Sequence, residues 1–378
     1  MKYYINLFFA QSLGIKYNGG LDYAYNLLHQ LQESKEDFTL IVLSLDVENI
    51  DEMCRDYRLE LIKVSSSKEI SSLLNKEKEF VLFEPMPYNA EEFIRLHNHG
   101  KFYIVIHGLR DVELPNTIER LKYGNFYKEL VKFVFIKKFK EKLVDKYNKL
   151  VALDNVYVIT VSFYSKSSIE FYLDNSKDVM KIYPPVQKKV KLSLEKDNNI
   201  LKKINVKENN YILMTGSERW SKNTKYVTKA IFELLTKHNY KIDILILGSK
   251  PNSIVQYSGF NVIHFEYLDD VDFEIIMKNA FLFVYPSLNE GFGYPPLYAM
   301  KLGTPVVASS ISSIAEVLSS GSLYFCPLEK DDIILKIDTL ISNNSYREQL
   351  INDGYKRYKK VEELQREDFK KVLNLFNR

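Results

Sequence analysis

The chain contains little cysteine, carries little net charge and lacks a long apolar run. Its 378 residues include two cysteines, Cys54 and Cys326, which lie far apart in the sequence. This excludes a disulfide-rich scaffold and a cysteine-based metal cluster, and it fits a reducing compartment. The formal net charge is +3, from 52 Lys and Arg against 49 Asp and Glu, so bulk charge does not indicate a nucleic-acid partner. No stretch approaches the roughly 18 consecutive apolar residues that a membrane-spanning helix needs.

The first residues also lack the features of an export signal. The segment MKYYINLFFAQS has a short apolar run, but no basic region of useful length and no small-residue cleavage site. It therefore predicts a first buried strand, and we expect a cytoplasmic protein.

Strand-like and helix-like segments alternate along the whole chain. Hydrophobic residues make up 46% of the sequence, which is enough for substantial cores. Repeated βα units favour parallel sheets with helices on both faces, so the predicted fold class is α/β. The predicted strands cover residues 3–10, 38–45, 59–64, 79–84, 102–107, 156–162, 211–216, 241–247, 261–265, 281–286, 305–310 and 323–327. The predicted helices include residues 21–31, 68–74, 90–99, 126–150, 224–238 and 273–280.

A polar, Lys-rich stretch interrupts the alternation once, after Tyr183-Pro184-Pro185. We interpret residues 186–210 as a linker between two Rossmann-like domains. The first domain covers residues 1–185 and the second covers residues 211–356. A last helical segment follows at about 357–378.

The most informative stretch is YPSLNEGFGYPPLYAMKLGTPVVASSISSIAE, residues 285–316. The continuous apolar run at its start predicts a buried parallel strand. Glu290 lies in the following turn, where Gly291 and Gly293 let the backbone approach a ligand. The Pro-Pro pair that begins at Pro295 fits the first turn of a helix. A carboxylate beside a helix N-terminus that can hold phosphate indicates a sugar-nucleotide pocket.

This stretch resembles the signature of GT4-type retaining glycosyltransferases, PSxxEGFGxPxxEAMxxGxPVV. The resemblance implies the GT-B fold, in which two Rossmann-like domains with parallel sheets face each other across a cleft and the last helix packs back on the first domain. It also implies that the donor site includes Phe292, Tyr294 and the neighbouring glycines. The chain departs from the pattern at Tyr298, where the family has a second Glu that holds the ribose hydroxyls of the donor. The matching residues are Pro286, Ser287, Glu290, Gly291, Phe292, Gly293, Pro295, Ala299, Met300, Gly303, Pro305, Val306 and Val307.

A second candidate element is MTGSERWSKN, which opens the second domain. Its strand ends at Gly216 and a helix begins near Asn223, so Arg219 and Lys222 lie in a loop at the carboxyl end of a parallel strand, where open α/β sheets place their ligands. An Arg and a Lys there suit a diphosphate. The element resembles the Arg…Lys-Asn element of GT4 enzymes, which neutralises the leaving nucleotide diphosphate. Alone, it could equally be a solvated charged loop.

The first domain offers two further candidates. Gly19 and Gly20 directly precede an amphipathic helix, whose N-terminal N–H groups could hold phosphate or the reacting sugar. Their position resembles the glycine loop of the GT4 acceptor domain. His107 ends a predicted strand and resembles the family histidine that hydrogen-bonds the donor sugar. The plainer interpretations are an ordinary turn and a satisfied buried histidine.

Other polar residues have less specific assignments. Tyr267 and Leu268 lie in a stretch that resembles the one enclosing the base of the donor, which they would contact mainly through backbone groups. We expect Ser162 and Ser165 to cap a helix, and Lys166 is a weak candidate for donor contact. The charged residues after His107 could orient the acceptor or simply face solvent. They are Arg110, Asp111 and Glu113.

The segment 119–150 concentrates positive charge, with ten Lys or Arg against four acids, a local charge of +6. One interpretation is a solvated helical face. The other is peripheral contact with an anionic membrane, because aromatic residues interleave with the lysines as they do in interfacial helices. The aromatic residues are Tyr123, Phe126, Tyr127, Phe133, Phe135 and Phe139.

The resemblance implies a retaining transfer of sugar from a UDP-, GDP- or dTDP-linked donor to a glycan or lipid-linked acceptor, in bacterial surface polysaccharide or glycoconjugate synthesis. The predicted catalytic residues are Glu290, His107, Arg219 and Lys222, and no metal is expected. Tyr298 leaves open a deoxyribose donor, a rerouted ribose contact or lost activity. The alternative function is therefore a non-catalytic GT-B homologue that partners an active transferase. A sugar-nucleotide 2-epimerase has similar domains, but it would not be expected to carry both motifs.

Overall fold

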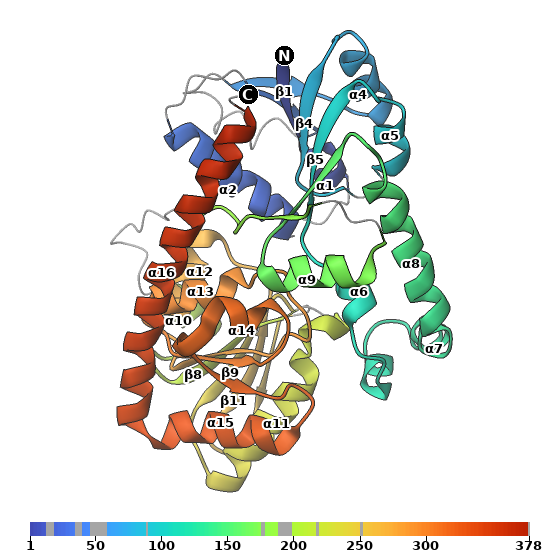
Figure 1. The fold of residues 1–378 in the computed structure, drawn as a ribbon. Coiled ribbons are helices and arrows are strands. Elements are labelled where there is room, and N and C mark those ends of the chain that lie inside the picture. The colour runs from blue at the N-terminus through green and yellow to red at the C-terminus, as the bar shows by residue number, and fades with distance from the viewer. Residues whose placement is uncertain are drawn as a thin grey trace. The chain divides into compact units, whose positions relative to one another are not determined.

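The protein consists of two compact α/β units in a computed structural model (Figure 1). The first unit contains residues 1–112, 140–188 and 362–378, and the second contains residues 113–139 and 189–361. The residues that the structure describes are 1–12, 19–34, 40–45, 59–87, 90–174, 178–187, 199–216, 219–249 and 252–376.

The first unit is built on a parallel sheet with the strand order β3-β2-β1-β4-β5-β6-β7. Strands β2 and β4 are mostly apolar and fully buried, as expected for a parallel sheet covered by helices. The strands are β1 (Lys2–Asn6), β2 (Leu40–Ser44), β3 (Leu59–Lys63), β4 (Phe80–Glu84), β5 (Gly100–Ile106), β6 (Val156–Thr160) and β7 (Met180–Lys181). The helices are α1 (Phe8–Gln11), α2 (Gly19–Glu33), α4 (Ser67–Leu74), α5 (Glu91–Arg95), α6 (Arg110–Glu113), α8 (Ile136–Val151) and α9 (Phe163–Tyr172).

The first predicted strand is too long. The structure ends β1 at Asn6 and begins the short helix α1 at Phe8, so the prediction of a strand over residues 3–10 is wrong in its second half. The side-chain Oδ1 of Asn6 accepts a hydrogen bond from the Phe8 N–H at 3.1 Å. Asn side chains favour turns by bonding to the backbone two residues on, and here this contact turns the chain away from the sheet.

The second unit contains a sheet with the order β10-β11-β9-β8-β12-β13-β14, parallel except for the edge strand β10. The strands are β8 (Tyr211–Thr215), β9 (Asp243–Leu247), β10 (Ser253–Gln256), β11 (Asn261–Phe265), β12 (Leu282–Tyr285), β13 (Val306–Ser309) and β14 (Ser322–Phe325). The helices are α7 (Phe126–Val134), α10 (Asn199–Ile204), α11 (Thr224–His238), α12 (Asp270–Lys278), α13 (Tyr294–Lys301), α14 (Ser313–Leu318) and α15 (Lys330–Ser342), with 3₁₀ turns η1 (Ile118–Lys122), η2 (Trp220–Lys222) and η3 (Ser319–Gly321).

The order of this sheet fixes where a ligand can bind. From β8 the chain moves outward through β9 to β11, and β12 then returns to pair with the other side of β8. Open α/β sheets bind ligands at the carboxyl ends of the strands, where the strand order reverses in this way. The switch point of the second unit therefore lies between the ends of β8 and β12.

One segment of the first half of the sequence belongs to the second unit. Residues 113–139 were expected within a first domain of residues 1–185, but they cluster with the second unit. The physical reason is an apolar cluster in which Leu114 and Tyr123 pack with Trp220 and Leu288, all at most 8% exposed. The Tyr123 and Trp220 rings lie 5.5 Å apart. We call residues 113–139 the strap.

The last helix is longer than the sequence suggested. Helix α16 runs from Asn344 to Phe376, so it starts 13 residues before the expected position, and its residues from 362 onward belong to the first unit. There, Asp368 accepts a hydrogen bond from Lys181 Nζ at 2.6 Å and from the Tyr183 N–H at 2.8 Å. Burial alone would raise the pKa of Asp368, but these bonds together hold it below its usual value.

We expect Asp368→Asn to destabilise the first unit by about 2 kcal/mol at pH 7, because it leaves the buried Lys181 charge without its partner. The low pKa in the folded state contributes stability above the unfolded value of about 3.9, which is lost as the pH falls through the folded-state pKa. Urea unfolding should therefore show a difference between the two proteins that shrinks at acid pH.

The matched control is Asp353→Asn, which removes a carboxylate of the same helix that is 34% exposed and lies 3.5 Å from Lys356. Exposed pairs of this kind contribute little. An equal loss of stability in both variants would show that the Asp368 contacts are not what holds the end of α16.

Candidate functional site

Two charged residues meet at the switch point of the second unit. The Nζ of Lys222, which follows β8, lies 2.6 Å from the Oε1 of Glu290, which follows β12. Their side chains are 18% and 15% exposed. The two loops also bond through their backbones, since the Leu288 N–H donates to the Ser221 carbonyl at 2.7 Å. Residues that lie 68 positions apart in the sequence therefore form one local structure.

A buried tyrosine lies beneath this pair. Tyr285, the last residue of β12, is 1% exposed, and its ring centroid lies 5.6 Å from Lys222 Nζ. Burial raises the pKa of Tyr285 well above its ordinary value, and the Glu290 charge raises it further, whereas Ser287 and the Arg219 charge lower it. These effects place Arg219 and Ser287 in the same electrostatic environment as Glu290. Tyr285 was not singled out from the sequence, because an aromatic residue at a strand end is most simply a core residue.

The turn that carries Glu290 is held by the loop after β13. The Glu290 N–H donates to Ser312 Oγ at 3.0 Å, and Ser313 Oγ donates to the Glu290 carbonyl at 2.7 Å. Gly293, with a φ of +98°, is the N-cap of α13, and a proline follows in the first turn as predicted. Ser312 and Ser313 were missed because serines in a polar loop carry no signal until the sheet order is known.

Two glycines allow the loops after β8, β9 and β11 to pack closely, on the side of β8 away from β12. A Cβ at Gly216, after β8, would lie 2.3 Å from Thr224 Oγ1. A Cβ at Gly248, after β9, would lie 2.5 Å from the Gly216 carbonyl and 3.0 Å from the Tyr267 ring. Tyr267, after β11, thus lies against these loops and remains 45% exposed. Leu268 follows it, so both residues lie at the predicted edge of the sheet.

Asn223 has a structural role at the start of α11. It adopts a left-handed backbone with a φ of +53°, and its Nδ2 donates to the Pro327 carbonyl at 2.7 Å. The side chain is fully buried. These contacts shape the loop that carries Arg219 and Lys222, so Asn223 acts on the site by positioning its neighbours.

Tyr298, at the position of the second family Glu, contacts an acid from a different helix. Its hydroxyl donates to Oε2 of Glu274 on α12, and both residues are 6% exposed. The Tyr298 ring stacks on Phe273 with an interplanar angle of 11°, and Lys301 Nζ lies 4.8 Å from its centroid. Sequence analysis did not single out Glu274, because a lone Glu within a helix carries no signal.

The remaining predicted residues belong to the first unit. Gly19 and Gly20 begin α2, and His107 directly follows β5. His107 Nε2 lies 2.8 Å from the Pro85 carbonyl, and the ring packs edge-on against Tyr23 at 5.2 Å. A neutral His107 that donates from Nε2 has Nδ1 as its acceptor. Their roles in donor binding stay predictions.

The capping prediction in the first unit is confirmed. Ser162 Oγ accepts a hydrogen bond from the Ser165 N–H at 3.0 Å and is the N-cap of α9. Lys166 lies 3.6 Å from Glu170, an i,i+4 pair on the same helix.

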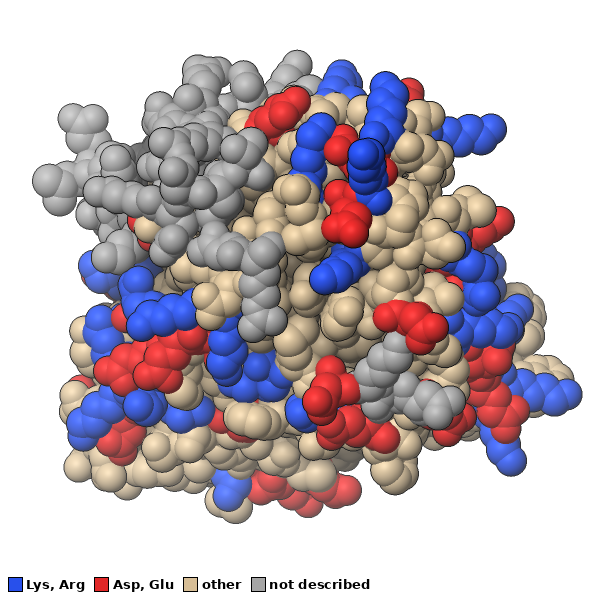
Figure 2. All heavy atoms as spheres, turned by 45° about the horizontal axis from the view of Figure 1, so that its top comes forward, with Lys and Arg blue, Asp and Glu red and all other residues tan. Residues whose placement is uncertain are grey.

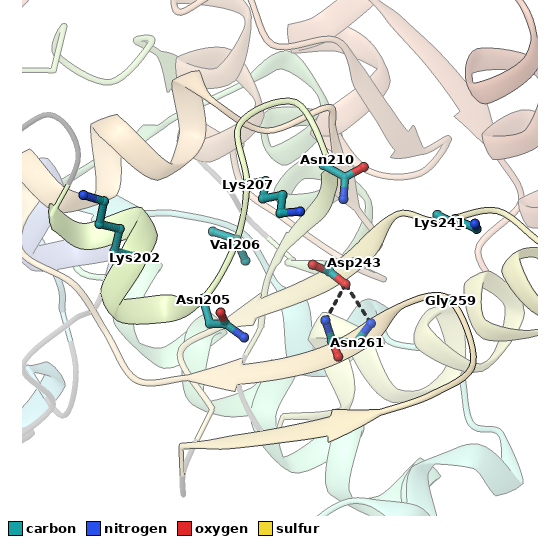
Figure 3. A pocket seen from close by; sticks show the side chains of 9 residues that line it. All are labelled: Lys202, Asn205, Val206, Lys207, Asn210, Lys241, Asp243, Gly259 and Asn261. Carbon is teal, nitrogen blue, oxygen red and sulfur yellow. Dashed lines mark hydrogen bonds between the residues drawn. The ribbon is translucent and has the colours of Figure 1, made fainter.

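A further hollow lies at the opposite edge of the second sheet (Figure 3). It is lined near the amino ends of the strands, and Asp243 there accepts two hydrogen bonds from Asn261. The side chains of Lys202 and Lys241 point away from the centre in this view. Ligands of such sheets bind at the other edge, so this hollow is separate from the candidate site. Its lining is Lys202, Asn205, Val206, Lys207, Asn210, Lys241, Asp243, Gly259 and Asn261.

Most of the second unit is similar to a known protein family. Residues 196–357, which include all of the switch-point loops, match the family model described as glycosyl transferases group 1. This part of the chain is therefore similar to that family. Two of the relatives are an uncharacterised glycosyltransferase of Methanocaldococcus jannaschii, 26% identical over 55% of this chain and 58% of its own length, and the O-antigen chain mannosyltransferase RfbU of Salmonella typhimurium, 32% identical over 45% and 47%. The chain thus matches only about half the length of these relatives.

Two solved structures share the fold over nearly the whole chain. Anabaena HepE in complex with UDP and glucose covers 99% of this chain and 100% of its own, with a TM-score of 0.69 at 10% identity. WaaG, a glycosyltransferase involved in lipopolysaccharide biosynthesis, covers 99% of both chains with a TM-score of 0.60 at 13% identity. The predicted GT-B fold with two Rossmann-like domains is therefore confirmed.

We expect His107 to titrate below the ordinary histidine pKa of about 6.5. Burial lowers its pKa and the Arg110 charge lowers it further, while the hydrogen bond to Pro85 opposes both. Because the unfolded chain then binds more protons than the folded one below pH 6.5, His107 should reduce stability as the pH falls. Histidine NMR titration, with His107→Gln to assign the resonance, measures this directly. A pKa at or above 6.5 would contradict the buried environment.

Proposed function

We propose that the protein is a GT4-type retaining glycosyltransferase that moves a sugar from a nucleotide-diphosphate sugar to a glycan or lipid-linked acceptor in surface polysaccharide or glycoconjugate synthesis. The observation that carries the proposal is the contact between Lys222 and Glu290 at the switch point, beside the N-terminus of α13. The family of residues 196–357 and the O-antigen mannosyltransferase among the relatives support the reaction class.

The charged groups of the second unit match the parts of a nucleotide sugar. Arg219 and Lys222 would bind the diphosphate and stabilise the charge that develops on it as the sugar leaves. The N–H groups at the start of α13 would add the positive end of the helix dipole. Glu290 would accept hydrogen bonds from hydroxyls of the donor sugar. Since Glu290 is held by Ser312 and Ser313, its position is fixed before the ligand arrives.

Retention is a separate part of the proposal. In this mechanism the acceptor hydroxyl attacks from the face that the diphosphate leaves: the bond from the sugar carbon to the acceptor oxygen forms as the bond to the phosphate oxygen breaks, and the departing phosphate takes the hydroxyl proton. Catalysis then depends on positioning and electrostatics and needs no carboxylate nucleophile and no metal. His107 would orient the donor sugar, with Nδ1 accepting a hydroxyl hydrogen bond. The donor is UDP-, GDP- or dTDP-linked.

A non-catalytic partner of an active transferase is the second candidate function, and Tyr298 is the observation that favours it. A protein of that kind would be expected to lose affinity for donors. The pair of Lys222 and Glu290 argues against such a loss. Two loops hold this cation and this carboxylate 2.6 Å apart in a largely buried setting, which costs desolvation free energy. A protein that had lost its affinity for donors would gain nothing from that cost.

Isothermal titration with UDP, GDP and dTDP tests the proposal. We expect one nucleotide to bind and Arg219→Ala to weaken it at least tenfold, because a charge-assisted hydrogen bond to phosphate is lost. Arg366→Ala is the matched control, since Arg366 is an exposed Arg of α16 paired with Glu362. Binding of none of the three nucleotides to the folded protein would overturn the enzyme assignment in favour of the partner subunit. Once the donor is known, the anomeric configuration of the product by NMR tests retention.

A lipid-linked acceptor would require the protein to work at the inner face of a membrane, and part of the strap has a suitable surface. No described helix is long and apolar enough to cross a bilayer. Helix α7 and the start of α8, however, expose a run of large apolar side chains between lysines. Interfacial helices combine these two features. The apolar residues and their exposures are Phe126 (51%), Tyr127 (76%), Leu130 (36%), Val131 (58%), Val134 (63%) and Phe135 (54%).

Among the described residues on the face in Figure 2, the charges do not form a docking surface of one sign. On the face in Figure 2, Lys and Arg side chains are intermixed with Asp and Glu among the described residues. This pattern agrees with the small net charge and offers no extended basic surface for nucleic acid.

We expect Phe135→Asp to reduce binding to vesicles that contain phosphatidylserine by about tenfold. The substitution removes apolar area that the membrane would bury, and it adds a negative charge that the anionic lipid repels. Phe171→Asp is the control, since Phe171 on α9 is 80% exposed but lies outside this surface. Co-sedimentation gives the bound fraction. Equal effects of both substitutions, or binding that ignores lipid charge, would refute a specific membrane contact through residues 119–150.

A further inference from the structure

Glu274 and Tyr298 join two helices behind the switch point. Helix α12 connects β11 to β12 and α13 connects β12 to β13, so both run from the carboxyl edge of the sheet towards its amino edge. Because both connections move in the same direction across the sheet, right-handed crossovers put the two helices on the same face. Their contact therefore lies behind the gap between the ends of β8 and β12.

The depth of the contact suits the nucleoside part of a ligand. Glu274 is the fourth residue after the start of α12, and Tyr298 is the fourth residue after the start of α13. At a rise of 1.5 Å per residue, both lie about 6 Å below the edge that carries Lys222 and Glu290. Tyr267 lies three residues before the start of α12 and is partly exposed at the same edge.

Among the described residues, only one oxygen of the Glu274 carboxylate accepts a hydrogen bond. Its side chain is 94% buried, and Tyr298 donates to Oε2. Among the residues that the structure describes, no other donor forms a hydrogen bond or an ion pair with this carboxylate. Oε1 is not among the fully buried atoms that lack a partner, so it keeps some contact with solvent and can accept a hydrogen bond from a ligand hydroxyl. Burial raises the pKa of Glu274, while the charges of Lys301 and Lys278 lower it.

We propose that Glu274 is the ribose-recognition residue of the donor site, with Oε1 accepting a hydrogen bond from a ribose hydroxyl and Tyr298 acting as its positioning residue. The inference rests on the proposed function and names the part of the nucleotide that this side chain reads. The family carboxylate at position 298 is then replaced by one from the neighbouring helix α12, and Tyr298 holds it through its hydroxyl. The stack on Phe273 and the contact with Lys301 fix the Tyr298 ring for this role.

A ribonucleotide donor follows from this assignment. A bound nucleotide would cover Oε1. If the ribose hydroxyl is absent, this covered oxygen has no donor, and an acceptor left unpaired costs more than the bond itself contributes. The site should therefore reject a deoxyribose donor, which Tyr298 alone had left open.

The test compares the affinities of UDP and GDP with those of their 2′-deoxy and 3′-deoxy forms by isothermal titration. The wild-type protein should bind the ribonucleotide at least tenfold more tightly than one of the deoxy forms. In Glu274→Gln this ratio should fall towards one, because the charged acceptor is lost while the affinity for that deoxy form changes little. Tyr298→Phe should lower the same ratio, whereas a merely structural role would weaken both ligands equally. Asp270→Asn is the control, as it removes an exposed carboxylate from the first turn of the same helix.

The outcomes separate this inference from the proposed function. Arg219-dependent binding without ribose discrimination, or discrimination that survives Glu274→Gln, would overturn the role of Glu274 and leave the glycosyltransferase assignment intact. Binding of no nucleotide would overturn both. Should Glu274→Gln fail to fold, the ratio in Tyr298→Phe decides the question by itself.

Discussion

The contact between Lys222 and Glu290 is the interaction on which the candidate site depends. Neither charge is well exposed, and taking an ion out of water costs several kcal/mol unless a partner repays it. Each residue is the other's partner, so the loops after β8 and β12 are held together by the charges they carry. In the proposed reaction the diphosphate takes over Lys222, which leaves Glu290 to accept hydrogen bonds from the sugar. In this proposal, the groups that hold the two loops together are the same groups that the ligand would contact.

The surrounding structure supports that pair from three directions. Serines after β13 hold the backbone of Glu290, Tyr285 closes the site from below, and Asn223 shapes the loop of Lys222 from its left-handed backbone. The strap adds a fourth contact, because Leu114 and Tyr123 pack on Trp220 and Leu288, the neighbours of the two charged loops. In addition, the Asn289 side chain donates to Glu113 of the strap. The segment that carries the exposed apolar surface of α7 is therefore built onto the loops of the candidate site.

Much of the fold was predictable from local patterns. Continuous apolar runs gave most strands of both sheets within one or two residues, since a strand buried on both faces has no polar alternation to blur its limits. Helix α11 spans the predicted residues 224–238. Three strands were predicted with wrong limits or not predicted, either because a local contact turned the chain or because the strand has a weak sequence pattern. Asn6 turned the chain earlier than hydrophobicity suggested, β7 has only two residues, and β10 is exposed on both faces.

The sequence by itself determined the fold class and the main elements of the site, because Glu290, Gly293 and the proline that begins the helix lie within a few residues and their chemistry is local. It also determined that position 298 lacks the family carboxylate. Only the tertiary structure decided what replaces it. Glu274 lies 24 positions from Tyr298 on another helix, and nothing in the spacing links them. The same holds for the strap, since the packing of Tyr123 on Trp220 joins residues almost 100 positions apart. Such contacts depend on strand order and helix packing, which no local pattern encodes.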